Sequence, residues 1–120
     1  DLQNKDTGEE RDKFYNEYGI KISKIEEIDT FNDLNGVTSL IDICNFVITV
    51  SNTNAHISGS IGKETFLLLP KGKGKLWYWN SLKNRSIWYN SIHIIQQSKI
   101  DKWDEPIKKL KILIEEKING

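Results

Sequence analysis

The chain has 120 residues, enough for one small domain with a modest core, and we expect residues 1–120 to form a single domain. It carries 17 basic and 17 acidic residues, so no global field favours nucleic acid or a membrane surface. Its one cysteine excludes an internal disulfide and fits a reducing, cytoplasmic location, and no apolar run is long enough to span a bilayer.

The first predicted helix begins near Thr7 and ends at Gly19. Thr7 and Glu10 have the spacing of a capping box, in which each side chain satisfies a backbone N–H group at the helix start. Phe14 and Tyr18 lie four residues apart and mark the inner side of the helix. Gly19 suits the left-handed position that ends many helices.

A second helix is predicted over residues 35–45, after a short alternating segment at 20–22 that reads as a strand. The acidic residues between these two segments are typical of a solvated loop, and no histidine stands at metal-ligand spacing from them. The helix has an apolar stripe at i, i+3, i+4 and i+7, formed by Val37, Leu40, Ile41 and Cys44. On this stripe, Cys44 is predicted to be a small core residue.

Two short apolar runs, residues 46–50 and 65–69, surround a small-residue segment. Neither run alternates with polar residues, which favours strands buried on both faces of a parallel sheet. Ser51, Asn52 and Thr53 are good N-cap residues and Gly62 suits the C-terminal end of a helix. The pattern predicts a β-α-β unit whose helix begins at the carboxyl end of a central strand, where open α/β sheets bind ligands.

The predicted helix contains small residues, including Gly59, which costs roughly 1 kcal/mol relative to Ala inside a helix. One interpretation is close packing against the sheet. The other is an anion site, in which backbone N–H groups at residues 52–55 and the helix dipole attract negative charge. Neither standard glycine-rich phosphate motif is present, so the residues alone leave both interpretations open.

A basic loop at residues 71–75 follows the second apolar run. Its three Lys alternate with Gly, and they could reach an anion at the neighbouring helix start or simply face solvent. An aromatic segment at residues 76–89 comes next. We expect Trp77 or Trp79 near a ligand cleft and Trp88 in the core, with a polar turn at residues 80–86.

The last predicted elements are a strand over residues 91–96 and a C-terminal helix. His93 lies inside the strand and is predicted to be structural. Asp101 is predicted to cap the helix. The expected inner face has 4, 3, 4, 4 spacing and consists of Trp103, Ile107, Leu110, Ile114 and Ile118.

The string from Val47 to Lys63, VITVSNTNAHISGSIGK, resembles the V-I-(S/T)-V-D-T-x-x-A-H-L-A-G-A-L-G-K motif of GT-B glycosyltransferases. It is similar in particular to the glycosyltransferase domain that follows tetratricopeptide repeats, a relative of O-GlcNAc transferases and heptosyltransferases. The resemblance continues through residues 67–70, 76–79, 86–89 and 103–104. One departure is the family's Asp-Thr pair, which reads Ser51-Asn52 here.

The resemblance implies a three-layer, Rossmann-like α/β fold with a mainly parallel sheet, and a partner that is a nucleotide-diphosphate sugar. It implies no cofactor and no metal, and it does not specify the acceptor. Ser51, Asn52, Thr53, Asn54 and His56 would bind the donor together with Lys71, Lys73, Lys75, Trp77 and Trp79. The alternatives are a non-catalytic protein-interaction module of a tetratricopeptide-repeat protein and a general nucleotide-binding domain.

The chain contains no Met, and residues 1–3 look like the end of a strand. We therefore expect a fragment, namely the later part of a C-terminal domain, which lacks the catalytic residues of the other domain. Missing strands would leave apolar surface uncovered, which favours a homodimer of the fragment.

Overall fold

The structure is a computed structural model, and it describes residues 1–3 and 5–120. The chain forms two compact units, Asp1–Leu40 and Ile41–Gly120. The boundary between the two units, after Leu40, falls within the helix α2 (Leu34–Ile43).

The N-terminal unit contains the helix α1 (Gly8–Tyr18). Gly19 ends this helix in the left-handed conformation, with φ of 67°, which confirms the predicted stop. The predicted capping box does not form, because the hydroxyl of Thr7 donates to the carboxylate of Asp1 instead of capping the helix. Residues 20–22 form no strand, so the alternation of three residues was too short to specify one.

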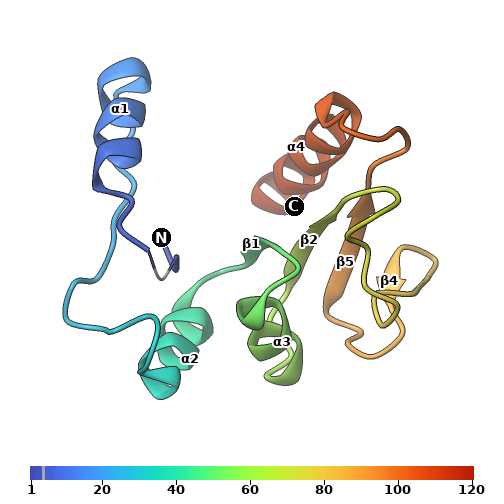
Figure 1. Ribbon diagram of the computed structural model, residues 1–120, viewed down its shortest axis with the longest axis horizontal. Coiled ribbons are helices and arrows are strands. Elements are labelled where there is room, and N and C mark those ends of the chain that lie inside the picture. Colours follow the sequence, from blue (N-terminus) through green and yellow to red (C-terminus); the bar gives the residue numbers. More distant parts are fainter. Residues whose placement is uncertain (4) are drawn as a thin grey trace. The chain divides into compact units, whose positions relative to one another are not determined.

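The C-terminal unit is built on a five-stranded sheet with the order β1-β2-β5-β4-β3. The strands β1 (Val47–Val50), β2 (Thr65–Leu69) and β5 (Ile92–Gln96) are parallel and lie side by side (Figure 1). The strands β3 (Ser81–Leu82) and β4 (Arg85–Ser86) form a small antiparallel hairpin that pairs with β5. The prediction of an α/β fold with a mainly parallel sheet is thus confirmed in outline, and the sheet as a whole is mixed.

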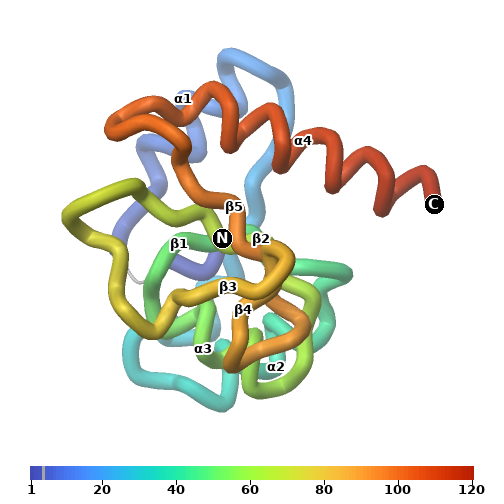
Figure 2. The backbone as a smooth tube through the Cα atoms, turned by 90° about the vertical axis from the view of Figure 1, so that its right-hand side faces the viewer, coloured from blue at the N-terminus to red at the C-terminus, as the bar shows by residue number. Residues whose placement is uncertain are grey.

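Two helices cover opposite faces of the parallel strands (Figure 2). The helix α3 (Thr53–Ser60) packs on the face that carries Leu67, Leu69, Ile92 and Ile94. The helix α4 (Asp104–Asn119) packs on the face that carries Phe66 and Ile95. Side chains alternate between the two faces of a strand, and a helix covers each face of β2. Apolar residues are therefore favoured at every position of this strand. This explains the unbroken run TFLLL, all but one of whose residues are buried.

The strand β1 lies at the edge of the sheet and not at its centre. Ile48 is 46% exposed and Val50 is 52% exposed, so the prediction of a central strand buried on both faces was wrong for β1. An apolar run shows that a strand is hydrophobic, but it does not show how many neighbours the strand has. Cys44 is exposed as well, because α2 ends at Ile43 and the residue falls outside the helical stripe.

The helix α4 begins later than predicted. Its N-cap is Trp103, and Asp101 lies in a left-handed turn, with φ of 55°, instead of capping the helix. The buried residues of α4 are Pro106 and Leu110, and Leu113 and Ile114 are half-buried beside the sheet. The predicted inner face is therefore correct in its middle only, since Ile107, Ile118 and Trp103 are exposed. No helix among the described residues is long and apolar enough to cross a membrane.

Candidate functional site

The first turn of α3 follows the carboxyl end of β1 directly. Asn52 is its N-cap and has an extended backbone, and its side-chain oxygen accepts from Ala55 N at 3.2 Å and from Thr49 Oγ1 at 3.1 Å. Thr53 is exposed at the first helical position, and Asn54 is half-buried with its carbonyl accepting from Ser58 Oγ at 2.7 Å. The N-cap prediction is confirmed, and the cap fixes the direction in which α3 leaves the strand.

A buried tryptophan holds the loop that leads into α3. Trp79 is 0% exposed, and its indole Nε1 donates to Ser51 Oγ at 2.8 Å. The ring of His56 stacks on this indole with centroids 4.9 Å apart. Three of the residues that the sequence placed in the site are thus brought together across 28 positions of chain. The burial of Trp79 gives it a positioning role, because a ligand cannot stack on a ring that has no exposed surface.

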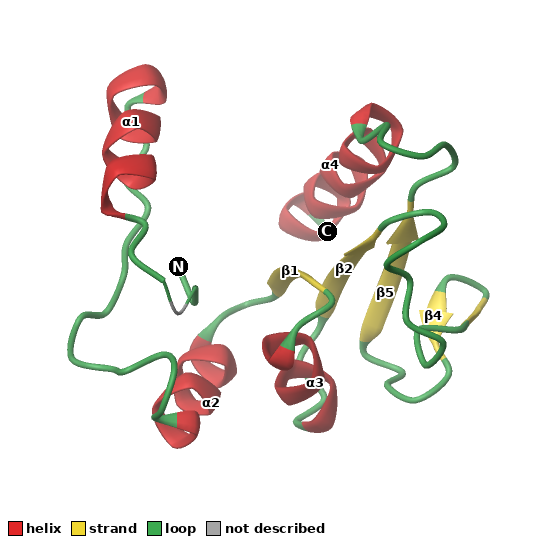
Figure 3. Ribbon diagram, viewed as in Figure 1, coloured by secondary structure: helices red, strands yellow, loops and turns green. Residues whose placement is uncertain are grey.

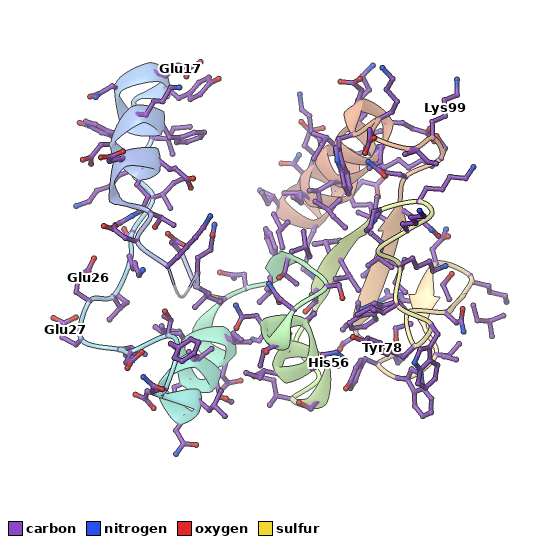
Figure 4. The ribbon with its side chains drawn as sticks, viewed as in Figure 1. Glu17, Glu26, Glu27, His56, Tyr78 and Lys99 are labelled. Atoms are coloured by element: carbon purple, nitrogen blue, oxygen red, sulfur yellow. The ribbon has the colours of Figure 1, made fainter. Side chains whose placement is uncertain are left out.

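Two tyrosines complete this aromatic cluster. The hydroxyl of Tyr89 lies 3.1 Å from His56 Nδ1, and the ring of Tyr78 has its centroid 5.3 Å from that of His56. Figure 4 shows His56 and Tyr78 beside each other next to α3. The sequence placed neither tyrosine in the site. The imidazole is therefore fixed on one side by the indole and at Nδ1 by a phenol.

Gly59 explains how Tyr89 reaches His56. A Cβ atom at Gly59 would lie 2.4 Å from the ring of Tyr89, which is closer than any real contact. The helix therefore needs Gly at this position for the approach of a ring, and not for the approach of the sheet. A glycine inside a short helix was the sequence signal that could have located this contact.

We expect Gly59→Ala to destabilise the protein by up to about 2 kcal/mol, although Ala is the better helix former. The clash with the Tyr89 ring, at roughly 1–3 kcal/mol for overpacking, exceeds the gain in helix propensity of about 1 kcal/mol. Urea denaturation followed by circular dichroism measures the change. In a Tyr89→Ala background the same substitution should become neutral or stabilising. A Gly59→Ala single variant more stable than the parent protein would contradict this packing.

The basic loop follows β2, as predicted, and it forms the start of the long segment that joins β2 to the hairpin (Figure 3). Lys71 Nζ donates to the Ser98 carbonyl at 2.7 Å, and Lys75 Nζ donates to Gln96 Oε1 at 3.2 Å. Both ammonium groups therefore lie against the carboxyl end of β5, while Lys73 is exposed. Because β1, β2 and β5 are parallel, the loop and the start of α3 lie at the same edge of the sheet.

The exposed tryptophans differ from those expected. Trp77 is 75% exposed, as a ligand-stacking residue would be, but Trp88 is 64% exposed, so its predicted place in the core was wrong. The polar turn at residues 80–86 is a two-residue hairpin turn in which Lys83 and Asn84 have φ of 49° and 61°. Trp88 lies in the segment between β4 and β5, outside the sheet, and belongs to neither the Leu67 nor the Phe66 core cluster.

Three titratable side chains lie on the α4 face of the sheet, where Glu64 contacts both Lys117 and His93. Glu64 Oε1 lies 3.2 Å from His93 Nε2, and the ammonium group of Lys117 donates to the other carboxylate oxygen. The Lys117 hydrogen bond lowers the pKa of Glu64. Burial lowers the pKa of His93, and the charge of Arg85 lowers it further, while the bond with Glu64 acts in the opposite direction. The net effect is a pKa of His93 below its ordinary value, which favours the neutral ring, and this ring stacks on Phe66 with centroids 5.2 Å apart.

No protein-family model, no curated protein and no solved structure matches the chain. Within residues 1–3 and 5–120, no cluster of three or more His, Cys, Asp or Glu side chains could hold a metal ion.

Proposed function

We propose that the carboxyl edge of the sheet binds the diphosphate of a nucleotide sugar, and that the chain is the donor-binding part of a cytoplasmic glycosyltransferase-like protein. The proposal takes its substrate class from the resemblance of residues 47–63 to the GT-B motif. The observation that supports it is that the start of α3, with Ser51 and Asn52, and the basic loop after β2 lie at this one edge, and that Trp79 links Ser51 to His56.

The first turn of α3 supplies the chemistry that a diphosphate needs. Backbone N–H groups at a helix start point along the helix axis, and the helix dipole places partial positive charge there. Asn52 caps the turn without adding negative charge, which an Asp at the N-cap would do. A helix start that is capped by Asn is therefore better suited to bind an anion than one that is capped by Asp.

The residues would divide into binding and positioning roles. Thr53 and Lys73 are exposed and free to approach an anion, and Trp77 is exposed for stacking on a base or a sugar. Trp79 would position Ser51 and His56. As the glycosidic bond breaks, negative charge grows on the leaving diphosphate, and fixed N–H groups and Lys ammonium groups would stabilise it. The general base would come from a second domain, so we expect the chain alone to transfer no sugar.

The test is a titration with UDP, GDP and ADP followed by tryptophan fluorescence. We expect saturable quenching by one of the three diphosphates, because the exposed indole of Trp77 adjoins the basic loop. Asn52→Asp should weaken binding at least tenfold, since Asp keeps the cap but brings a negative charge next to the anion. Asn52→Ser keeps the cap with no charge and should bind nearly as tightly as the parent protein.

Lys73→Ala should weaken binding about threefold, as expected for one solvent-exposed charge. Lys108→Ala is its matched control, because Lys108 is an exposed lysine on α4 and lies outside the site. If none of the diphosphates binds, the donor-site proposal is wrong and the chain is better described as a non-catalytic interaction module. Equal binding by Asn52→Asp and Asn52→Ser would place the nucleotide elsewhere.

A further inference from the structure

A cleft lies at the edge of the sheet opposite the proposed nucleotide site, where β2 and β5 begin. It is an open cleft of about 620 Å³ lined by Gly59, Gly62, Glu64, Arg85, Trp88, Tyr89, Asn90 and Ser91. Seven of the eight precede β2, which begins at Thr65, or β5, which begins at Ile92, and Arg85 is the first residue of β4. The cleft is therefore separate from the proposed nucleotide site at the carboxyl edge of the sheet.

The cleft carries one uncompensated positive charge. Arg85 forms no ion pair with any side chain that the structure describes, and one of its N–H groups donates to the Asn90 carbonyl at 3.1 Å. A guanidinium has five N–H donors, so the rest of its fork remains available. The only acid in the lining, Glu64, is already paired with Lys117. The charge balance thus matches a ligand with a single negative charge.

A hydroxyl in the same cleft lacks a partner. Ser91 Oγ is buried and makes no hydrogen bond among the described residues. An unsatisfied buried polar group costs roughly 1–3 kcal/mol, and native proteins retain few of them without a functional reason. Because this hydroxyl has no exposed surface in the free protein, a ligand reaches it only if the Ser91 side chain rotates toward the cleft, and it can then donate to an acceptor oxygen.

The remaining walls suit a flat apolar group. Trp88 is 64% exposed and offers an indole face, and Gly59 and Gly62 contribute no side chains. Tyr89 is held in place by His56 at 3.1 Å and packs over Gly59, so this wall is formed before a ligand arrives. Exposed aromatic faces beside a few convergent polar groups are the usual composition of small-molecule sites.

We propose that this cleft binds a small carboxylate that carries a flat apolar group. The carboxylate accepts from the Arg85 guanidinium and from Ser91 Oγ, and the flat group stacks on Trp88. Guanidinium and carboxylate match in shape and charge, so the ion pair sets the orientation of the ligand. The proposal is independent of the nucleotide-sugar site at the other edge.

The probe is benzoate, which has one carboxylate on one flat ring. Two-dimensional NMR of the backbone amides and indole N–H groups follows its binding. We expect saturable shifts at residues 85–91 and at the Trp88 indole, with none at Trp77. Benzamide has the same shape without the charge, and acetate has the charge without the ring. Each should bind at least tenfold more weakly than benzoate. Equal affinity of benzamide would overturn the charge recognition, and equal affinity of acetate would overturn the stacking.

Three variants separate the proposed contacts. Arg85→Gln should lower benzoate affinity at least tenfold, while Lys108→Gln, which removes an exposed charge elsewhere, should not change it. Trp88→Ala should lower benzoate affinity about as much as Arg85→Gln does. Its control is Trp77→Ala, which should leave benzoate affinity unchanged. Ser91→Ala is the sharpest test, because it removes a buried hydroxyl that has no partner. This variant should weaken benzoate binding several-fold while leaving the free protein as stable as the parent or more stable.

The outcomes are decisive in both directions. If benzoate shifts none of these resonances, or if Arg85→Gln binds it as the parent does, the proposal is wrong. If Ser91→Ala is destabilised and binds normally, the hydroxyl serves the fold and not a ligand. If the protein binds benzoate but none of UDP, GDP and ADP, only the nucleotide-site proposal is wrong. If it binds one of these diphosphates but not benzoate, only the cleft proposal is wrong.

Discussion

Replacing Trp79 with Ala is expected to destabilise the protein by about 3–5 kcal/mol, the range for removing a large aromatic side chain from a core. Trp79 is 0% exposed and packs in the cluster that contains Leu67 and Ile92. Its loss would also leave Ser51 Oγ without its donor and His56 without the ring on which it stacks. Because single domains are stable by only about 5–15 kcal/mol, this change removes a large part of the free energy of unfolding.

Urea denaturation followed by far-ultraviolet circular dichroism measures this loss without relying on the removed fluorophore. Trp77→Ala is the matched control, because Trp77 is 75% exposed and its removal should change stability by no more than about 0.5 kcal/mol. Trp79→Phe keeps most of the ring but not the N–H group, and should lie between the two. Similar losses for Trp77→Ala and Trp79→Ala would show that the loop before the hairpin does not hold Trp79 in the core.

Phe66→Ala is expected to cost a similar 3–5 kcal/mol, and to act on the other face of the sheet. Phe66 is 1% exposed and packs with Ile95 and Leu110 beneath α4. Its ring also meets that of Phe46 edge to face, with centroids 5.7 Å apart. Leu82→Ala is the control, since Leu82 is 69% exposed on the hairpin and should change stability by less than about 0.5 kcal/mol.

The same variant has a second readout at His93. Burial is the main reason that the pKa of His93 is below its ordinary value of 6.5, and the Phe66 ring covers one face of the imidazole. Without that ring, water reaches the imidazole and stabilises its protonated form, so the pKa should rise toward 6.5. An NMR titration of the His93 ring measures this. A pKa that stays low in folded Phe66→Ala would show that Arg85, and not burial, dominates.

The two proposed sites share one structural support. His56 stacks on Trp79, which faces the start of α3, and hydrogen-bonds Tyr89, which lines the cleft at the other edge. The small residues of α3 allow this arrangement, because Gly59 gives the Tyr89 ring its space. A helix of eight residues, Thr53–Ser60, thus contributes to both edges of the sheet.

The sequence by itself determined those features that depend on local physics. The buried run at residues 65–69, an N-cap within residues 51–53 and the left-handed stop at Gly19 follow from hydrophobicity, side-chain reach and backbone freedom, and the structure then selects Asn52 as the cap. It also indicated that β1, α3 and β2 form a parallel β-α-β unit, because two apolar runs with a short helix between them have few other solutions.

The tertiary structure alone decided which strand lies at the edge and which tryptophan is buried. β1 and β2 look alike in sequence, but only β2 has a strand on each side, because β5 pairs with β2 after 22 intervening residues. Likewise, Trp79 is buried because it packs with Leu67 and Ile92 from two different strands, whereas Trp88 lies between β4 and β5 and is exposed. Burial depends on neighbours that are distant in sequence, and no local pattern contains that information.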